Sequence, residues 1–102
     1  MNTFVMLTRV SSDVVRNPQM LEELEKRAME HIRHDCPEVK WRGSYVLLGP
    51  YDYLDLFEAP DITTATKVST LIRTYGRAHS EIWPATEWGT FKAMLRDMPH
   101  AA

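Results

Sequence analysis

The sequence predicts an α+β domain in which a four-stranded antiparallel sheet carries its two main helices on one face. Three observations support this prediction. Short segments rich in β-branched and aromatic residues alternate with longer segments whose apolar residues recur at helical spacing. The order of these segments is β-α-β-β-α-β with a C-terminal helix added, which is the split pattern of ferredoxin-like folds. The 102 residues show no repeat, linker or low-complexity segment, so we expect one domain over residues 1–102.

The N-terminal part of the chain predicts a strand followed by a helix. Residues Thr3–Arg9 are β-branched and aromatic and are apolar on both parities, which predicts a strand buried on two faces. Asn17 is a suitable N-cap, and Pro18 fits the first helical position, where a missing N–H is tolerated. Pro37 ends the helix, because the residue before a proline is disfavoured in the α region. The buried stripe of this helix consists of Leu21, Leu24, Ala28 and Ile32.

The next two segments predict a β-hairpin. Strands over Glu38–Leu48 and Tyr53–Ala59 are joined by a tight reversal at Gly49–Asp52, where glycine and proline favour a turn. The predicted cross-strand pairs are Leu48 with Tyr53, Val46 with Asp55, and Ser44 with Phe57.

The C-terminal part predicts helix, strand and helix. Asp61 caps the first of these helices, and Gly76 is placed to end it in a left-handed conformation. Residues Arg77–Ala85 form the fourth strand, and Thr86 caps a terminal helix that docks either on its own domain or on a neighbouring subunit. The apolar stripes are Ala65, Val68, Ile72 and Tyr75 in the first helix, and Trp88, Phe91, Leu95 and Met98 in the terminal one.

Two apolar faces of the predicted sheet favour self-association. Side chains alternate along a strand, so each strand contributes to both faces. The set predicted to pack beneath the helices is Trp41, Tyr45, Leu47, Leu54 and Leu56, and the set left uncovered is Val46, Leu48, Tyr53 and Phe57. A turn of odd length would exchange the two faces. In both arrangements the face without helices is apolar and exposed to water, which soluble proteins seldom tolerate. We therefore expect a homodimer or higher homo-oligomer in which two sheets close into a dimeric α/β barrel.

Composition excludes several classes of function. The net charge is −2, from 12 basic and 14 acidic residues, which gives no electrostatic attraction to nucleic acid or to an anionic membrane. RNA-recognition domains share this element order, but the strand Tyr53–Ala59 is acidic and lacks their basic and aromatic signature. No apolar run approaches the roughly 20 residues that cross a bilayer, and the N-terminus lacks a secretory pattern. Cys36 is the only cysteine, so we expect a cytoplasmic protein.

A metal or other cofactor is not expected. His31 and His34 lie one helical turn apart with Cys36 two residues later, and such residue types can bind zinc. The arrangement lacks a second clustered pair, and it falls at a helix end where histidine is favoured in solvent. Cys36 has no obvious base partner, so nucleophilic catalysis is unsupported.

Several short motifs occur together in a fairly specific order and spacing. They are "FVMLT" near the start, a strand ending in Tyr45, "GPYD" (Gly49–Asp52), "EAPD" (Glu58–Asp61), Gly76, and "SE" at Ser80 and Glu81. In these motifs the chain resembles the GYD-domain family over nearly its whole length. The resemblance implies a ferredoxin-like fold of the dimeric α/β-barrel type, usually in oligomers, and the family has no established common activity.

The resemblance also bears on particular residues. The family signature maps onto Gly49, Tyr51 and Asp52, with Pro50 inside it. His79 stands where relatives often carry arginine, which implies that an anionic ligand would be held here only by a protonated imidazole.

Two groups of polar residues are candidates for a site. Tyr51 and Asp52 either contact a ligand at the mouth of the barrel, or Asp52 holds the turn by accepting backbone N–H groups. Asp55 lies among apolar neighbours in the middle of a strand, and such a carboxylate destabilises the fold unless it is paired or neutralised. Three further candidates share one parity of the fourth strand: His79, Glu81 and Trp83.

Enclosure in a barrel would make these residues suitable for proton transfer or for binding a ligand. It would raise the pKa of Asp55 or Glu81 and suit that group to proton transfer. Tyr53 and Trp83 would then form walls for an aromatic or planar molecule. The alternative is a purely structural contact or an interface salt bridge, for which the available basic partners are Arg9, Arg42 and His79.

Two hypotheses of function follow. The favoured one is a homo-oligomeric binding or accessory protein that holds a small organic molecule in the barrel or in a subunit cleft. Its ligand-binding residues would be Tyr51, Asp52, Tyr53, Asp55, His79, Glu81 and Trp83. The alternative is a cofactor-independent enzyme, such as an isomerase, decarboxylase or monooxygenase, with an acid–base pair drawn from Asp55, His79 and Glu81. The first is favoured because the sequence shows no nucleophile–base pair, phosphate loop or metal cage.

Overall fold

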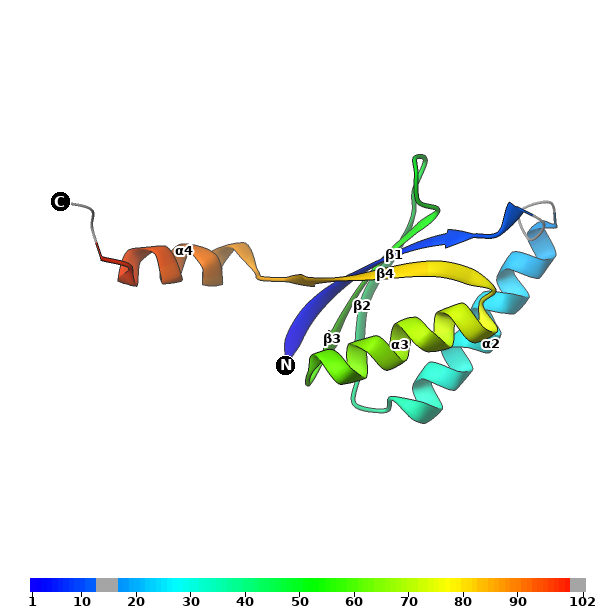
Figure 1. The fold of residues 1–102 in the computed structure, drawn as a ribbon, viewed down its shortest axis with the longest axis horizontal. Helices are drawn as coiled ribbons and strands as arrows, with labels where there is room; N and C mark the ends of the chain where they lie inside the picture. Colours follow the sequence, from blue (N-terminus) through cyan, green and yellow to red (C-terminus); the bar gives the residue numbers. More distant parts are fainter. Residues whose placement is uncertain (13–16, 100–102) are drawn as a thin grey trace.

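The computed structural model of the chain describes residues 1–12 and 17–99, and it has the expected α+β, ferredoxin-like order (Figure 1). The elements are β1 (Asn2–Val10), α2 (Pro18–Asp35), β2 (Lys40–Val46), β3 (Tyr53–Ala59), α3 (Ile62–Tyr75), β4 (Ala78–Ala85) and α4 (Trp88–Asp97). No helix in these described ranges is long and apolar enough to cross a membrane.

The four strands form one antiparallel sheet in the order β2-β3-β1-β4. Helices α2 and α3 lie side by side on one face of this sheet (Figure 1). We call this the helix face and the opposite one the open face, because no helix of the described chain covers it. This division decides which candidate residues can share a site.

The hydrophobic core lies between the helix face and the two helices. Met6 and Phe57 from the sheet meet Ile32 of α2 and Val68 of α3, and all four are almost fully buried. Phe57 stacks between the rings of Phe4 and Trp41, at centroid distances of 5.7 and 5.3 Å. Burial of aromatic and aliphatic side chains contributes most of the stability of such a core.

The hairpin register differs from the prediction. The observed pairs are Val46 with Tyr53, Ser44 with Asp55, and Trp41 with Phe57, with an irregularity between Trp41 and Gly43. The connection therefore spans residues 47–52 rather than four residues, and it is closed by a 2.8 Å bond from the Leu47 amide to the Asp52 carbonyl. Such a bulge re-aims the side chains that precede it, and it brings Trp41 onto the same face as Ser44 and Val46.

The predicted assignment of the two sheet faces was also wrong. The set containing Tyr53, Asp55 and Phe57 faces the helices, whereas Leu54 and Leu56 face the open side. The physical reason is that Phe57 pairs with Phe4 of β1, and together they form the apolar surface on which the helices pack. The core therefore lies on the helix face, and Asp55 lies on the same face.

Helix ends match the sequence in part. Asn17 and Asp61 cap α2 and α3 as predicted. Gly76 was predicted to be left-handed, but it has φ −87° and ψ −8°, and the following residue, Arg77, takes the positive φ of 50°. Glu87 rather than Thr86 caps α4, and its side chain accepts a hydrogen bond from the Thr90 amide at 2.9 Å.

Helix α4 stands away from the rest of the molecule. It follows the far end of β4 and projects beyond the sheet (Figure 1), without extended contact to any other described element. Its apolar side is exposed, with Trp88 64% and Met94 50% accessible. The helix therefore does not dock on its own domain, which was one of the two predicted options.

Candidate functional site

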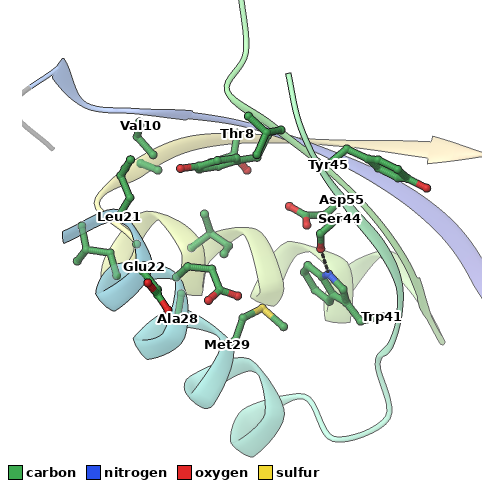
Figure 2. A pocket seen from close by; sticks show the side chains of 17 residues that line it. Thr8, Val10, Leu21, Glu22, Ala28, Met29, Trp41, Ser44, Tyr45 and Asp55 are labelled. Carbon is green, nitrogen blue, oxygen red and sulfur yellow. Dashed lines mark hydrogen bonds between the residues drawn. The ribbon is translucent and has the colours of Figure 1, made fainter. Parts of the chain in front are cut away.

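A cavity of about 390 Å³ lies between α2 and the helix face of the sheet (Figure 2). Helix α2 packs against α3, and the strand positions beneath the N-terminal half of α2 carry short polar side chains. These side chains are Thr8, Ser44 and Asp55. Short side chains cannot fill the space that bulky apolar ones fill nearer the core. Most of the wall is apolar, from Val10, Leu21, Leu24, Ala28, Met29, Trp41, Val46, Tyr53 and Ile72.

Asp55 is the carboxylate that the sheet contributes to this cavity. Its strand pairs it with Met6 on one side and Ser44 on the other. Burial raises the pKa of the Asp55 carboxyl, and the nearby charge of Glu25 raises it further, while hydrogen bonding with Ser44 and Trp41 opposes the shift. Asp55 therefore holds its proton to a higher pH than an ordinary aspartate.

A hydrogen bond between Trp41 and Ser44 fixes the position of the Trp41 ring in the cavity wall beside Asp55. Trp41 Nε1 donates to Ser44 Oγ at 2.8 Å, as Figure 2 shows. Tyr53 also lines the cavity, and burial raises the pKa of its phenol, with the charges of Asp52 and Asp55 adding to that effect. Of the residues predicted to bind a ligand, Tyr53 and Asp55 lie here.

Thr8 is a cavity residue that the sequence analysis did not single out. Its side chain is 4% exposed, and Oγ1 has no hydrogen-bond partner within the described chain. A buried hydroxyl without a partner destabilises the fold by about 1–3 kcal/mol. The available signal was a hydroxyl residue directly after the apolar run Phe4–Leu7, but that pattern does not distinguish a core threonine from one beside a cavity.

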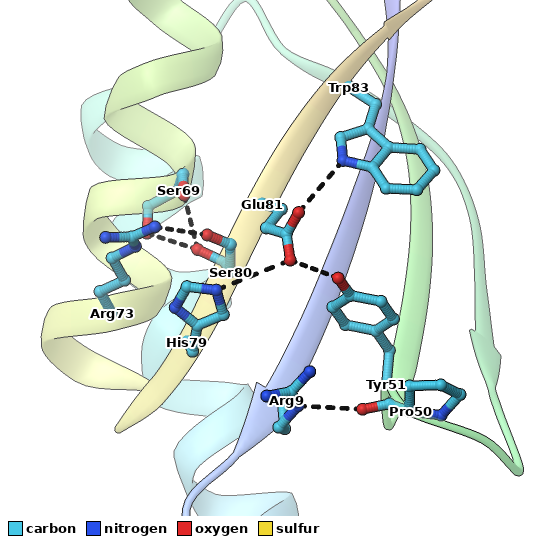
Figure 3. Close-up of polar contacts among 9 residues, drawn as sticks. All are labelled: Arg9, Pro50, Tyr51, Ser69, Arg73, His79, Ser80, Glu81 and Trp83. Carbon is cyan, nitrogen blue, oxygen red and sulfur yellow. Dashed lines mark hydrogen bonds and ion pairs between the residues drawn. The ribbon is translucent and has the colours of Figure 1, made fainter.

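A second polar group occupies the open face (Figure 3). Tyr51 Oη donates a short hydrogen bond to Glu81 Oε2, and Trp83 Nε1 donates to Oε1 at 3.4 Å. His79 Nε2 lies 3.7 Å from Glu81 Oε2. The bond from Tyr51 holds the pKa of the Glu81 carboxyl below its usual range. This direction is opposite to the rise that enclosure in a barrel would produce.

A comparison with models of protein families shows to which family the chain belongs. The model of the GYD domain matches residues 4–95. The chain belongs to the GYD-domain family. A search of curated proteins found no match.

The residues that map onto the GYD signature attach the β2–β3 hairpin to the sheet. Asp52 Oδ2 accepts the Val10 amide at 2.9 Å, and the Asp52 amide donates to the Thr8 carbonyl at 2.8 Å. Asp52 thus holds backbone groups, as one of the two predicted alternatives had it, but it holds β1 as well as the turn.

Arg9 completes this attachment. Its guanidinium lies 5.2 Å from the centre of the Tyr51 ring, and its Nε donates to the Pro50 carbonyl at 2.9 Å (Figure 3). Cation–π contacts of this kind favour a fixed ring position. In this GYD domain the signature turn is therefore anchored to β1 and, through Tyr51, to Glu81 of β4.

The sheet separates the predicted site residues into two groups. Asp55 and Tyr53 lie on the helix face, whereas His79, Glu81 and Trp83 lie on the open face. A single chain of this GYD protein therefore does not bring Asp55 together with His79 or Glu81. The cavity is the more developed of the two sites, because it combines a volume of about 390 Å³ with a buried hydroxyl, that of Thr8, which has no partner in the described chain.

The residues considered for zinc lie in separate surroundings. His31 stacks on Tyr75 at 3.6 Å between ring centres, His34 pairs with Asp35, and Cys36 is buried. Within residues 1–12 and 17–99, no group of three or more His, Cys, Asp or Glu side chains is placed to hold a metal ion.

Proposed function

We propose that this protein binds a small organic molecule in the cavity beneath α2. The observation that carries the proposal is an apolar cavity of about 390 Å³ that contains the half-buried carboxyl of Asp55 and the unpartnered hydroxyl of Thr8. Binding sites for small molecules are typically apolar clefts of about 300–1,000 Å³ with a few polar groups. The cavity lies on the helix face, so this site is located differently from the barrel or subunit cleft that the sequence suggested.

The proposal includes assembly as a homodimer or higher homo-oligomer. The open face exposes Tyr45 and Trp83 beside the apolar residues Leu54 and Leu56, and α4 projects with its apolar side uncovered. Monomeric proteins seldom leave apolar surfaces of this extent in water. A second copy supplies both complementary surfaces at once, since a twofold interface repeats the same patch on each subunit.

A cytoplasmic location is part of the same proposal. Cys36 is the only cysteine in the sequence and its side chain is buried. Folding therefore requires no disulfide, which suits a reducing compartment.

The binding proposal can be tested with 2-phenylethanol, a neutral probe that fits the cavity. We expect amide shifts in NMR titrations to concentrate at Thr8, Asp55 and the N-terminal half of α2. Ala28→Leu adds carbon atoms inside the cavity and should weaken binding about tenfold or more, because overpacking costs about 1–3 kcal/mol. Ala93→Leu adds the same atoms on exposed α4 and is the matched control.

Ala78→Leu gives a second cavity-filling variant, because Ala78 lines the cavity from β4. Far-UV circular dichroism establishes that each variant is folded. Shifts spread over the open face, or equal binding by the cavity-filling variants and by Ala93→Leu, would contradict the proposal.

A second candidate function is a cofactor-independent enzyme of the isomerase, decarboxylase or monooxygenase type. The observation that favours it is the raised pKa of Asp55 inside an apolar cavity, since proton-transfer residues are tuned in this way. Asp55 would act there without His79 or Glu81, which lie across the sheet. Benzylacetone in D₂O is a test: a general base should exchange its α-protons, and Asp55→Asn should abolish that exchange. Exchange at the buffer rate would exclude this role.

A further inference from the structure

We infer that the cavity beneath α2 is built for a small organic cation, a primary amine with an apolar body. The inference rests on the proposed function and specifies the class of ligand for the same site. It follows from the signs of the charges around the cavity, from the acceptors inside it, and from the unpartnered hydroxyl of Thr8.

The charges around the cavity are all of one sign. Asp55 contributes a carboxyl group from the sheet, and Glu22 and Glu25 contribute two more from α2 on the other side. No arginine, lysine or histidine of the described chain lines the cavity. A carboxylate or phosphate ligand would meet only repulsion there, whereas an ammonium group would be attracted from both sides.

The acceptors inside the cavity match the donors of an ammonium group. Asp55 and Thr8 lie on the adjacent strands β3 and β1 and face the same side of the sheet, since Thr8 pairs with Tyr53, two positions from Asp55. Thr8 Oγ1 is buried and lacks a partner in the described chain, so it is free to accept. An ammonium carries three donors and no acceptor, and it can satisfy both groups.

The rest of the wall suits a carbon skeleton. Leu21, Met29 and Ile72 line the space, and Tyr53 adds an aromatic ring. Apolar walls that carry charges of one sign favour a ligand with an apolar body and a charged end of the opposite sign. Binding of the cation would also compensate the partial burial of the Asp55 carboxylate.

The experiment compares three probes of nearly equal shape at pH 7 with the full chain: 2-phenylethylamine, 2-phenylethanol and phenylacetate. By isothermal titration calorimetry we expect the amine to bind about tenfold or more tightly than the alcohol, because charge-assisted hydrogen bonds are about twice as strong as neutral ones. Phenylacetate should bind most weakly. Asp55→Asn should remove the advantage of the amine over the alcohol.

Two further variants control this result. Asp97→Asn removes one carboxylate from exposed α4, far from the cavity, and should leave the preference for the amine intact. Glu25 lies on the exposed rim of the cavity, and Glu25→Gln should reduce the preference for the amine by a smaller factor than Asp55→Asn does. Because Glu25 is exposed, this variant is expected to fold even if the change at Asp55 disturbs the sheet.

The outcomes separate the inference from the proposed function. If the alcohol binds in the cavity and the amine binds no more tightly, or if phenylacetate binds best, the inference is overturned while the binding function stands. If none of the three probes binds, both are overturned. A preference for the amine that persists in Asp55→Asn would place the charge recognition elsewhere and overturn the inference.

Discussion

At the scale of single residues, Asp55 links stability to the cavity. Burial raises its pKa above the ordinary aspartate value of 3.8, so the folded chain binds this proton more tightly than the unfolded chain does. The stability associated with Asp55 is therefore fully present below about pH 3.8 and is lost as the pH rises through the raised folded value. Above that folded value the ionised carboxylate destabilises the fold.

Asp55→Asn should consequently unfold at a higher denaturant concentration than the wild type at pH 7, because it removes a buried charge while retaining hydrogen-bonding groups. The advantage should shrink as the pH approaches 4. Urea unfolding at both pH values measures this, with Asp97→Asn on exposed α4 as the control for loss of a carboxylate. A less stable Asp55→Asn at pH 7 would show that the carboxylate has a stabilising partner.

The sequence identified Asp55 correctly as the unusual residue of its strand, because a carboxylate among apolar neighbours stands out in any register. It could not show that Asp55 lies across the sheet from His79 and Glu81. That relation depends on which face the helices cover, and Phe57 decides the face through its contacts with Phe4 of β1 and Trp41 of β2. Thr8 escaped notice because its significance comes from the space beside it.

At the scale of elements, the β2–β3 hairpin is attached to β4 through Tyr51. The bond from Tyr51 Oη is the largest influence that lowers the pKa of Glu81. Tyr51→Phe should therefore raise the pKa of Glu81 toward the ordinary glutamate value of 4.5, as measured by NMR titration of the Glu81 side chain. Tyr45→Phe is the matched control, because Tyr45 is exposed on β2. An unchanged Glu81 titration in Tyr51→Phe would mean that the hairpin is not held by this bond in solution.

Element boundaries show where local rules suffice. The caps at Asn17 and Asp61 were predictable because a short side-chain acceptor beside the first turn acts through its own neighbours. The end of α3 was also predicted at the right position, since the helix stops at Tyr75 and Gly76 is its C-cap, but the positive φ falls on Arg77 instead of Gly76. The prediction of the hairpin register was wrong, because a bulge before Gly43 and a longer connection leave little trace in the residue pattern.

At the scale of the whole molecule, the order of elements and their apolar periodicity were enough to predict the fold, because both are properties of the chain alone. The cavity was not predictable, because it depends on how α2 packs against α3 and on the short side chains of the sheet beneath α2. The position of α4 was left open for a related reason. Its apolar stripe showed that it needs a partner surface but did not show that β4 carries it away from its own sheet.

The projecting α4 leads to a prediction about assembly. If α4 packs on a second copy, a charge on its apolar side should weaken the oligomer, because an unpaired carboxylate would be buried in the interface. Leu95→Glu should raise the dissociation constant of the oligomer about tenfold or more, whereas Ala93→Glu, on the polar side of the same helix, should have little effect. Size-exclusion chromatography with light scattering over a range of concentrations measures both. A wild-type chain that stays monomeric at high concentration would refute the dimer. A Leu95→Glu chain that assembles as tightly as Ala93→Glu would show that α4 takes no part in the interface and leave the open face of the sheet as its surface.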